Sequence, residues 1–594
     1  MKYSNDIKKT WQVIRKIVKT ESRDSMIKEL SIDGKMTSNP ELMANSFNTY
    51  FTGLAESLSG KILPSVKTFK DYLPASSLNS LVLLPTSPQE IMIINKSLKI
   101  TNSSGIDDIN PHVASQVMDI LSDPLAKIIN SSLINGEIPL ELKIATVTPI
   151  YKQGAKTELS NYRPISVLPF FSKLFERIMY DRLFSYIKQK NLLYVLQHGF
   201  QPAHSTSMSL LDIQDKISES MDKNEYSLGI FLDLAKAFDT VDHKILLAKL
   251  EHYGIRDRAL DWLRNYLIDR QQQVRCNNYL SKRLPIRHGV PQGSILGPLL
   301  FIIYINDLPN STSLLHFILF ADDTNVFLSN SSYEQLFKTA NIELKSVSDW
   351  FRANKLSLNL SKTNLILFRS NKKQPPLTPN DLIIDDKTIP QVSSTKFLGV
   401  YIDQHLKWKV HIEEINKKIT KNIGILKRIS HVIPSHILLN LYFTLIYPYL
   451  TYCNIVWTST YITNLNNLII SQKKAVRVVT KSPRNSHTKP LFAQFNLLNV
   501  TQLRFVQTCE FMYKYRNNLL PPSFSSYFNL VPHNICLRNK HDYRSIYART
   551  NTRKMSIKFQ GPLSWNSLPL NIRSSSCYTR FRYSLRAHAA ESIV

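Results

Sequence analysis

Two adjacent aspartates between two apolar runs constrain the fold of this chain more than any other feature. Asp322 and Asp323 follow the apolar residues 317–320 and precede those at 326–328, which predicts a strand, a tight turn and a second strand. Aspartate is unfavourable in strands, so a pair at this place calls for a reason. Repulsion opposes ionising both groups unless a cation neutralises them, and hard oxygen ligands suit Mg²⁺. A metal site is one interpretation, and a solvated hairpin tip is the other.

A second apolar stretch also ends in an aspartate. Residues 230–232 predict a strand that delivers Asp233, and apolar residues at helical spacing follow from Val241 to Leu250. Two strand-end carboxylate sites of this kind suit a pair of metal ions held ~3.5–4 Å apart, the arrangement used for in-line phosphoryl displacement. Between them, residues 289–298 form a loop punctuated by three glycines that precedes an apolar helix. In this loop Gln292 offers an amide to a ligand.

These stretches are part of a longer, ordered set of motifs. The set comprises NYRPISVLP at residues 161–169, QHGF at 197–200, FLDLAKAFDTVDH at 231–243, GVPQGSILGPLLF at 289–301, FADDT at 320–324 and KFLGVYID at 396–403. In their order and spacing the chain resembles the reverse transcriptase of a non-LTR (LINE-type) retrotransposon, most specifically from about residue 100 to 405. The resemblance implies an RNA-directed DNA polymerase with an α+β, right-hand fold made of fingers, a palm with an antiparallel sheet, and a helical thumb.

The resemblance assigns catalytic roles to five positions. Asp233, Asp322 and Asp323 are the expected catalytic carboxylates. With the Leu234 carbonyl they are expected to hold two Mg²⁺ ions, for which Mn²⁺ is a substitute. Lys362 is the expected general acid for the leaving pyrophosphate, and a solvated surface lysine is its alternative.

Four further positions are expected to contact the incoming dNTP. Lys152 and Arg163 suit its triphosphate, because Lys acts as a point charge and Arg as a bidentate fork. Gln292 offers its amide, and Phe238 lies where the family places a ring that excludes a 2′-OH. The alternatives are salt-bridged surface residues and, for Phe238, ordinary core packing. The sequence departs from the family at Gln201, where an arginine usually follows QHGF.

The charge distribution predicts a polyanionic partner. The formal net charge is +29, and from residue 415 onward 25 Lys and Arg face only three carboxylates. In this part the sequence has a helical pattern with an apolar stripe from Ile415 to Leu426, which we expect to pack on the palm. Beside the stripe lies a basic flank, which we expect to contact the nucleic-acid duplex. The basic flank consists of Lys417, Lys418, Lys421, Lys427 and Arg428.

We expect five segments. They are a helical linker over 1–85, a helical amino-terminal part of the polymerase over 86–142, fingers and palm over 143–402, a thumb over 403–460 and a basic helical nucleic-acid-binding region over 461–594. The linker shows two amphipathic faces, one from Trp11 to Val18 and one from Met43 to Leu54, with a turn at Asp33 and Gly34. Aromatic residues between 511 and 528 fit either base stacking or core packing.

Several features bear on the cellular compartment. Five scattered cysteines form no CxxC pair, which favours a reducing compartment over a disulfide framework or a zinc knuckle. The start of the chain has no apolar secretory segment, so we expect an intracellular protein of the nucleus or cytoplasm. The uncharged residues 437–457 are long enough to cross a bilayer, but polar residues and a proline interrupt them and favour buried helices.

The expected partners are an RNA template, a DNA primer or target, and dNTPs, and the oligomeric state stays open. The family's amino-terminal apurinic-type endonuclease has no counterpart in this sequence, which suggests an element cut short at its 5′ end or a gene model that begins late. Two alternatives remain. One is a catalytically inactive, nucleic-acid-binding remnant, although intact Asp233, Asp322 and Asp323 speak against it. The other is a group II intron maturase, which the segment after residue 405 does not resemble.

Overall fold

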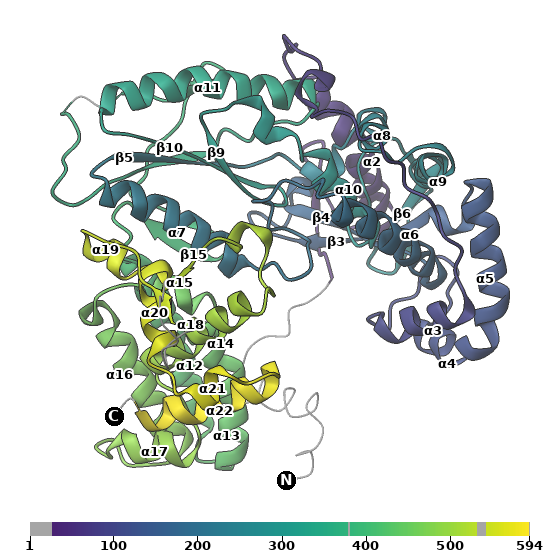
Figure 1. Ribbon diagram of the computed structural model, residues 1–594. Coiled ribbons are helices and arrows are strands. Elements are labelled where there is room, and N and C mark those ends of the chain that lie inside the picture. Colours follow the sequence, from purple (N-terminus) through teal and green to yellow (C-terminus); the bar gives the residue numbers. More distant parts are fainter. Residues whose placement is uncertain (1–25, 378–379, 532–541, 593–594) are drawn as a thin grey trace.

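The computed structural model describes residues 26–377, 380–531 and 542–592 and mixes helices with several sheets (Figure 1). The predicted α+β class is confirmed at this level. The amphipathic face predicted from Trp11 to Val18 and the cysteine at position 536 lie outside the described residues.

An antiparallel sheet of four strands, named here the central sheet, has the order β11-β5-β10-β9. Its strands are β5 (Tyr226–Leu232), β9 (His316–Phe320), β10 (Asp323–Asn330) and β11 (Asn364–Phe368). β9 and β10 form a hairpin with Asp323 opposite Phe320, so the predicted strand, turn and strand are confirmed.

Helices cover both faces of the central sheet. Helix α11 (Tyr333–Ala353) lies above it and α7 (Thr206–Asp222) below it in Figure 1. Because strand side chains alternate between faces, Ile230 belongs to the hydrophobic core shared with α11, whereas its neighbour Phe231 belongs to the core shared with α7. All seven residues of β5 are therefore buried.

A second sheet has the order β4-β3-β6-β7, with β8 also paired to β6. Its strands are β3 (Ile144–Tyr151), β4 (Tyr162–Val167), β6 (Arg270–Cys276), β7 (Tyr279–Leu280) and β8 (Leu284–Ile286). Helix α2 (Pro40–Ser59) packs on it through Met43, Phe47 and Phe51, which confirms the second predicted amphipathic face.

The turn predicted at Asp33 and Gly34 is confirmed, but it does not lie between helices. It joins the short strands β1 (Leu30–Ile32) and β2 (Lys35–Thr37), because both turn residues have positive φ and an Asp-Gly pair of this kind closes a two-residue hairpin.

Most helices of the first two-thirds of the chain surround the core shared with α11. They are α3 (Pro88–Ser97), α4 (Pro111–Gln116), α5 (Met118–Asn135), α6 (Phe170–Gln189), α8 (His243–His252), α9 (Asp257–Leu267) and α10 (Leu296–Tyr304). The glycine-punctuated loop does lead into an apolar helix, α10, as predicted. Two hairpins follow β11, formed by β12 (Ile383–Ile384) with β13 (Lys387–Thr388) and by β14 (Ser394–Phe397) with β15 (Val400–Asp403).

The rest of the chain forms a second mass, named here the helical body. Its helices are α12 (Lys409–Ile429), α13 (Ser435–Leu445), α14 (Tyr447–Thr451), α15 (Asn454–Trp457), α16 (Ile462–Val479), α17 (Thr488–Gln494), α18 (Val500–Arg516), α19 (Asn551–Lys554), α20 (Ile557–Asn566), α21 (Leu570–Arg573) and α22 (Tyr578–Ser592), with β16 (Asn529–Leu530) paired to β17 (Tyr543–Arg544). The uncharged residues 437–457 form helices as predicted, but they contribute to three, α13, α14 and α15, instead of a single pair. Among the described residues, no helix has the length and apolarity needed to cross a membrane.

One hydrophobic core runs from the central sheet through α7 into the helical body. It contains Phe231 of β5, Leu210 of α7, Trp408, Trp457 and, near the end of the chain, Trp565. The aromatic residues after 511 belong to this core, since Phe511, Phe524 and Phe528 are buried against one another. Core packing is therefore the correct alternative for these rings, and base stacking is excluded for the buried ones.

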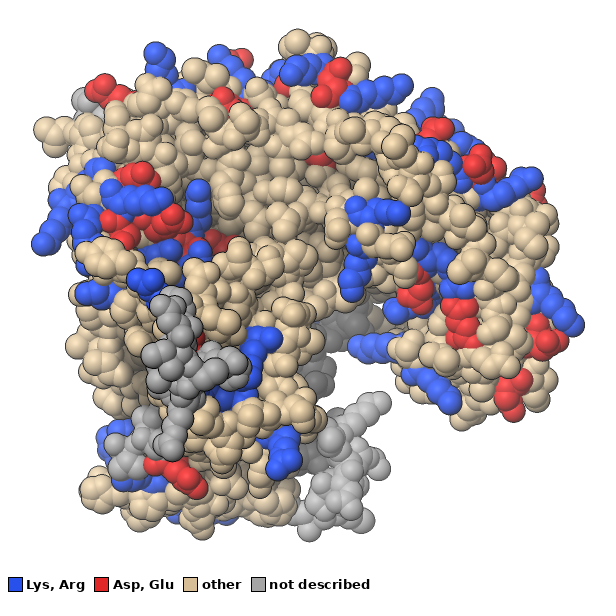
Figure 2. All heavy atoms as spheres, viewed as in Figure 1, with Lys and Arg blue, Asp and Glu red and all other residues tan. Residues whose placement is uncertain are grey.

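The surface is hollowed between the helical body and the arm that carries α3, α4 and α5 (Figure 2). Lys and Arg are more numerous than Asp and Glu over the face shown, as the net charge of +29 requires.

Candidate active site

The two predicted carboxylate sites meet at one end of the central sheet. β5 and β10 are antiparallel neighbours, and Leu232 pairs with Thr324. Asp233 follows Leu232, and Asp323 precedes Thr324, so both leave the sheet at the same end. Strands in a sheet lie about 4.8 Å apart, which brings groups distant in the sequence together.

Crowding of like charges perturbs these carboxyl groups. Burial raises the pKa of Asp322, and the charge of Asp233 raises it further. Burial of the carboxyl group and the charges of Asp322 and Asp233 raise the pKa of Asp323 to about 6. Asp233 Oδ2 accepts a hydrogen bond of 2.8 Å from Asn359 Nδ2, which fixes its orientation.

A buried glutamine supports the turn that carries the aspartates. Gln197 is 1% exposed, and its Oε1 accepts hydrogen bonds from the backbone N–H of Ala321 at 3.0 Å and of Gly199 at 2.8 Å. A Cβ at position 199 would lie 2.3 Å from the Ala321 nitrogen, so this close approach requires glycine. The QHGF motif therefore holds the residue directly before Asp322, a role that sequence reasoning missed because the two partners are 124 residues apart.

The predicted cations come from the hairpin of β3 and β4. Arg163 pairs with Ile150, and Lys152 lies two residues beyond Ile150, so both cations share one face. Burial lowers the pKa of Lys152, and the charges of Arg163 and Lys362 lower it further. The aspartates at positions 233 and 322 oppose this shift, so the structure brings the predicted cations and carboxylates into one neighbourhood.

One further cation lies in this neighbourhood and was not predicted. Lys236 has a left-handed backbone with φ of +53° and is half-buried. Its Nζ donates a hydrogen bond of 3.1 Å to the carbonyl oxygen of Tyr162 in β4. Lys236 therefore ties the loop after Asp233 to the strand that carries Arg163, and its partner 74 residues away gave no local signal.

Phe238 is half-buried between two other rings. It stacks on Phe301 with centroids 4.4 Å apart and meets Phe200 edge-on at 5.9 Å. The ring therefore packs against the core while remaining partly accessible, and the predicted role beside the sugar stays a prediction.

The amide of Gln292 is already engaged. Its side-chain Nε2 donates a hydrogen bond of 2.8 Å to Asp239 Oδ1, and the backbone carbonyl oxygen of Gln292 accepts one of 2.8 Å from Ser166 N. Burial raises the pKa of Asp239 to about 6. This bond uses one of the two N–H donors of the Gln292 amide, so a nucleotide contact by this side chain stays a prediction.

Helix α8 is capped by Asp242. The carboxylate of Asp242 accepts a hydrogen bond of 3.1 Å from Ile245 N and pairs with Lys355 Nζ at 2.7 Å. Asp239 takes no part in this cap.

The possible metal ligands at the aspartate end of the central sheet are mostly oxygen atoms. In the described part of the chain, no donor hydrogen-bonds to the Leu234 carbonyl oxygen, and no three His, Cys, Asp or Glu side chains form a ready-made metal cluster. The carboxylates nevertheless fit a hard divalent cation, since the raised pKa values of Asp322 and Asp323 arise partly from repulsion that such an ion would relieve.

The basic flank predicted on α12 is exposed at all five positions, and the apolar stripe faces inward, as expected. Contrary to the prediction, the stripe packs chiefly on α16 and on the hairpin strand β15 instead of on the central sheet, because the helical body supplies its own apolar surface. Lys417 pairs with Glu414 at 2.7 Å. In the described residues, the charged groups of Lys421, Lys427 and Arg428 have no such partner.

The chain is similar to known proteins over most of its length. Residues 150–402 match the family described as "Reverse transcriptase (RNA-dependent DNA polymerase)". The chain is 28% identical over 488 residues to the "Probable RNA-directed DNA polymerase from transposon BS" of Drosophila melanogaster, which is 79% of this chain and 53% of that protein. It is 27% identical over 502 residues to the "RNA-directed DNA polymerase from mobile element jockey" of the same organism, with 81% and 53% covered. The chain thus spans about half the length of these curated relatives.

Proposed function

We propose that this chain, whose residues 150–402 are a reverse transcriptase domain of the non-LTR retrotransposon kind, is an RNA-directed DNA polymerase that extends a primer 3′-OH. The observation that carries the proposal is the convergence of three carboxylates and several cations at one end of the central sheet. The central sheet then serves as the palm, the second sheet as part of the fingers, and α12 with its neighbours as the thumb. Its substrates are an RNA template, a DNA primer or target, and dNTPs.

Reverse transcriptases generally use divalent metal ions, and we propose two Mg²⁺ ions for this chain, with Mn²⁺ as a substitute. Asp233, Asp322, Asp323 and the Leu234 carbonyl are the groups that would hold them. When bound, the ions lower the charge on the attacking and leaving oxygens of an in-line displacement.

The remaining steps belong to the chain's own side chains. Lys152 and Arg163 bind and orient the triphosphate of the dNTP, because their charges lie close enough to the aspartates to perturb them. Lys362 lies near Lys152 and is exposed, so it is placed to give a proton to the departing pyrophosphate. Phe238 forms the wall beside the sugar. Catalysis here is mostly positioning and charge neutralisation.

The experiment compares Asp233→Asn and Asp322→Asn with Asp123→Asn, a control on the exposed face of α5, in primer extension on an RNA template. We expect extension to fall by at least roughly a thousandfold in the first two variants, because loss of either carboxylate removes charge stabilisation from the transition state. RNA affinity should stay within a few-fold of wild type, since carboxylates contribute nothing favourable to phosphate contacts. Near-normal extension by either active-site variant would overturn the proposed function.

A further inference from the structure

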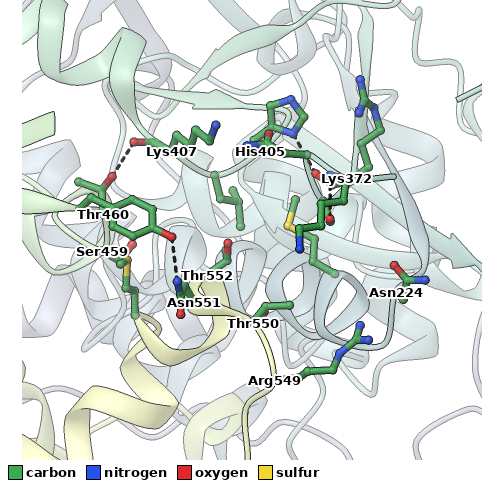
Figure 3. A pocket seen from close by; sticks show the side chains of 17 residues that line it. Asn224, Lys372, His405, Lys407, Ser459, Thr460, Arg549, Thr550, Asn551 and Thr552 are labelled. Carbon is green, nitrogen blue, oxygen red and sulfur yellow. Dashed lines mark hydrogen bonds between the residues drawn. The ribbon is translucent and has the colours of Figure 1, made fainter. Parts of the chain in front are cut away.

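A cavity of about 560 Å³ opens where distant parts of the chain meet (Figure 3). Its walls come from the end of α7, the segment after β11, the segment after β15 and two segments of the helical body. The cavity lies beside Asn224, just before β5 begins, whereas Asp233 follows the end of that strand. At ~3.3 Å per residue, the seven residues of β5 separate the cavity from the aspartates by roughly 23 Å.

The residues that line the cavity carry positive charge, and the two nearby carboxylates, Asp222 and Asp403, lie outside its lining. The four cations are Arg369, Lys372, Lys407 and Arg549, and His405 adds an imidazole. Among the described residues that line the cavity there is no Asp or Glu. Lys372 and Lys407 are exposed, and within the described ranges their ammonium groups make no hydrogen bond or ion pair. Like charges gathered in this way favour an anionic ligand.

Two carboxylates near the cavity are engaged by backbone groups. Asp222 accepts hydrogen bonds from the N–H groups of Thr550 at 2.7 Å and Arg549 at 2.9 Å. Asp403 accepts from the N–H groups of Lys407 at 3.1 Å and Trp408 at 2.6 Å. These acids hold the walls in place and leave the lysine ammonium groups free.

Hydrogen bonds between the walls fix the shape of the cavity. Thr460 Oγ1 donates to the carbonyl oxygen of Lys407 at 2.9 Å, and Asn551 Nδ2 donates to Tyr461 Oη at 3.0 Å (Figure 3). The two segments of the helical body are thereby joined to each other and to the loop after β15. A site that is formed before its ligand arrives loses less entropy on binding.

We propose that this cavity binds the backbone of single-stranded RNA at a place separate from the aspartates. Its volume lies within the range of small-ligand pockets, roughly 300–1,000 Å³, which accommodates a nucleotide unit. Lys372 and Lys407 would contact phosphates, and the hydroxyl and amide groups of the wall suit 2′-hydroxyls and base edges. Tyr461, which is 46% exposed, offers a ring on which a base can stack. This inference goes beyond the proposed function, because a chain that binds RNA without copying it would still have the site.

The test measures binding of a fluorescent single-stranded RNA of about 30 nucleotides to the full chain at several salt concentrations. The variant Lys372→Gln/Lys407→Gln is compared with Lys338→Gln/Lys345→Gln, which removes the same charge from exposed positions on α11, across the central sheet from α7. The log–log salt slope is the dependence of the logarithm of the RNA binding constant on the logarithm of the salt concentration. Each lost phosphate contact lowers the magnitude of this slope by about 0.7. We therefore expect the cavity variant to lower the slope by about 1.4 and to weaken RNA binding roughly tenfold at low salt, and the control to change the slope little.

Further measurements identify which phosphate-containing ligand the cavity binds. Single-stranded DNA and ATP are measured in the same way, and RNA containing 4-thiouridine is cross-linked to wild-type protein. The proposal is supported by a cross-link to Tyr461 or to residues 369–372 together with a smaller salt slope for the cavity variant. If the cavity variant then loses DNA binding in parallel, phosphate contacts contribute most of the affinity. The proposal is overturned by equal effects of the two double variants, or by a cavity variant that loses only ATP binding. Because all four lysines are exposed, melting temperatures should be unchanged.

Discussion

At the residue scale, Phe238 combines observed core packing with a proposed role in choosing the sugar of the nucleotide. Its ring is held from behind by the stack on Phe301, 4.4 Å away, and from the side by Phe200, yet it is only half-buried. A ring fixed on two sides makes a stiff wall, and a stiff wall discriminates by sterics because close-packed groups yield little. If the wall faces the sugar, only a deoxynucleotide fits beside it.

We therefore predict that Phe238→Val raises the kcat/KM for rNTPs relative to dNTPs by at least tenfold, equivalent to about 1.4 kcal/mol of lost discrimination. Steady-state incorporation of matched rNTP and dNTP pairs measures the ratio. The control is Phe301→Leu, which loosens the stack from the buried side without shortening the wall itself. A folded Phe238→Val enzyme with unchanged sugar preference, or an equal shift in the control, would assign Phe238 to packing alone.

At this scale the sequence indicated the candidate catalytic groups but not the residues that support them. Asp233, Asp322 and Lys152 stand in local patterns of strand and turn, and such patterns can be recognised in the amino-acid sequence. Gln197 and Lys236 act on backbone atoms 124 and 74 residues away, and no local pattern encodes such a distance. Gln292 was predicted to contact a nucleotide because its loop is rich in glycine, but its buried partner Asp239 was not foreseeable.

At the scale of elements, α12 separates an inward apolar stripe from an outward basic flank. Lys421, Lys427 and Arg428 are exposed and, within the described residues, have no ion-pair partner, whereas Lys417 is paired with Glu414 at 2.7 Å. A cation without a local partner gains most from a phosphate, because it breaks no existing pair to bind it. Under the proposed function, we infer that this basic flank contacts the primer–template duplex as the duplex leaves the aspartates.

We predict that Lys421→Gln/Lys427→Gln/Arg428→Gln shortens the products made in a single binding event, since the enzyme would dissociate from the duplex sooner. The log–log salt slope for duplex binding should fall by about 2.7, at ~0.9 per phosphate contact. Lys417→Gln should have a much smaller effect on both quantities. Product lengths are measured in extension reactions that contain an excess of unlabelled primer–template as a trap. If the triple variant makes products of wild-type length, α12 does not contact the duplex during extension.

The sequence predicted helices and strands correctly wherever its apolar residues recur with a clear helical or strand period. The stripe from Ile415 to Leu426 has a helical period, and α12 covers it. The Asp33–Gly34 pair specified a turn but not its flanks, because residues 30–37 are too few to show a period. What α12 packs on was mispredicted, since an apolar stripe reveals that a helix is partly buried and not which surface buries it.

At the scale of the whole molecule, composition suggested a basic tail, but the last third of the chain is built into the core. Trp457 and Trp565 are buried in the same core as Phe231 of the central sheet. Arg553 Nη1 pairs with Asp215 of α7 at 2.5 Å, and both side chains are largely buried. Positive charge and structural support therefore reside in one segment, and sequence alone does not separate them, because a net charge reports nothing about burial.

This arrangement predicts the outcome of removing residues 461–594. The truncation takes away α16, against which α12 packs, and exposes Trp408 and the buried face of α12 to water. Burial of each large apolar side chain contributes about 1.5–3 kcal/mol, so losing several is comparable to the roughly 5–15 kcal/mol that stabilises a typical folded protein. We expect the truncated chain to aggregate or to lose its cooperative melting transition, and with it polymerase activity.

The matched control is Lys473→Gln/Lys474→Gln in the full chain, which removes charge from exposed positions of α16 and should lower RNA affinity at an unchanged melting temperature. Scanning calorimetry and size-exclusion chromatography distinguish the two cases. A truncated chain that stays monomeric, melts as the full chain does and loses only RNA affinity would show that residues 461–594 are an independent nucleic-acid-binding region.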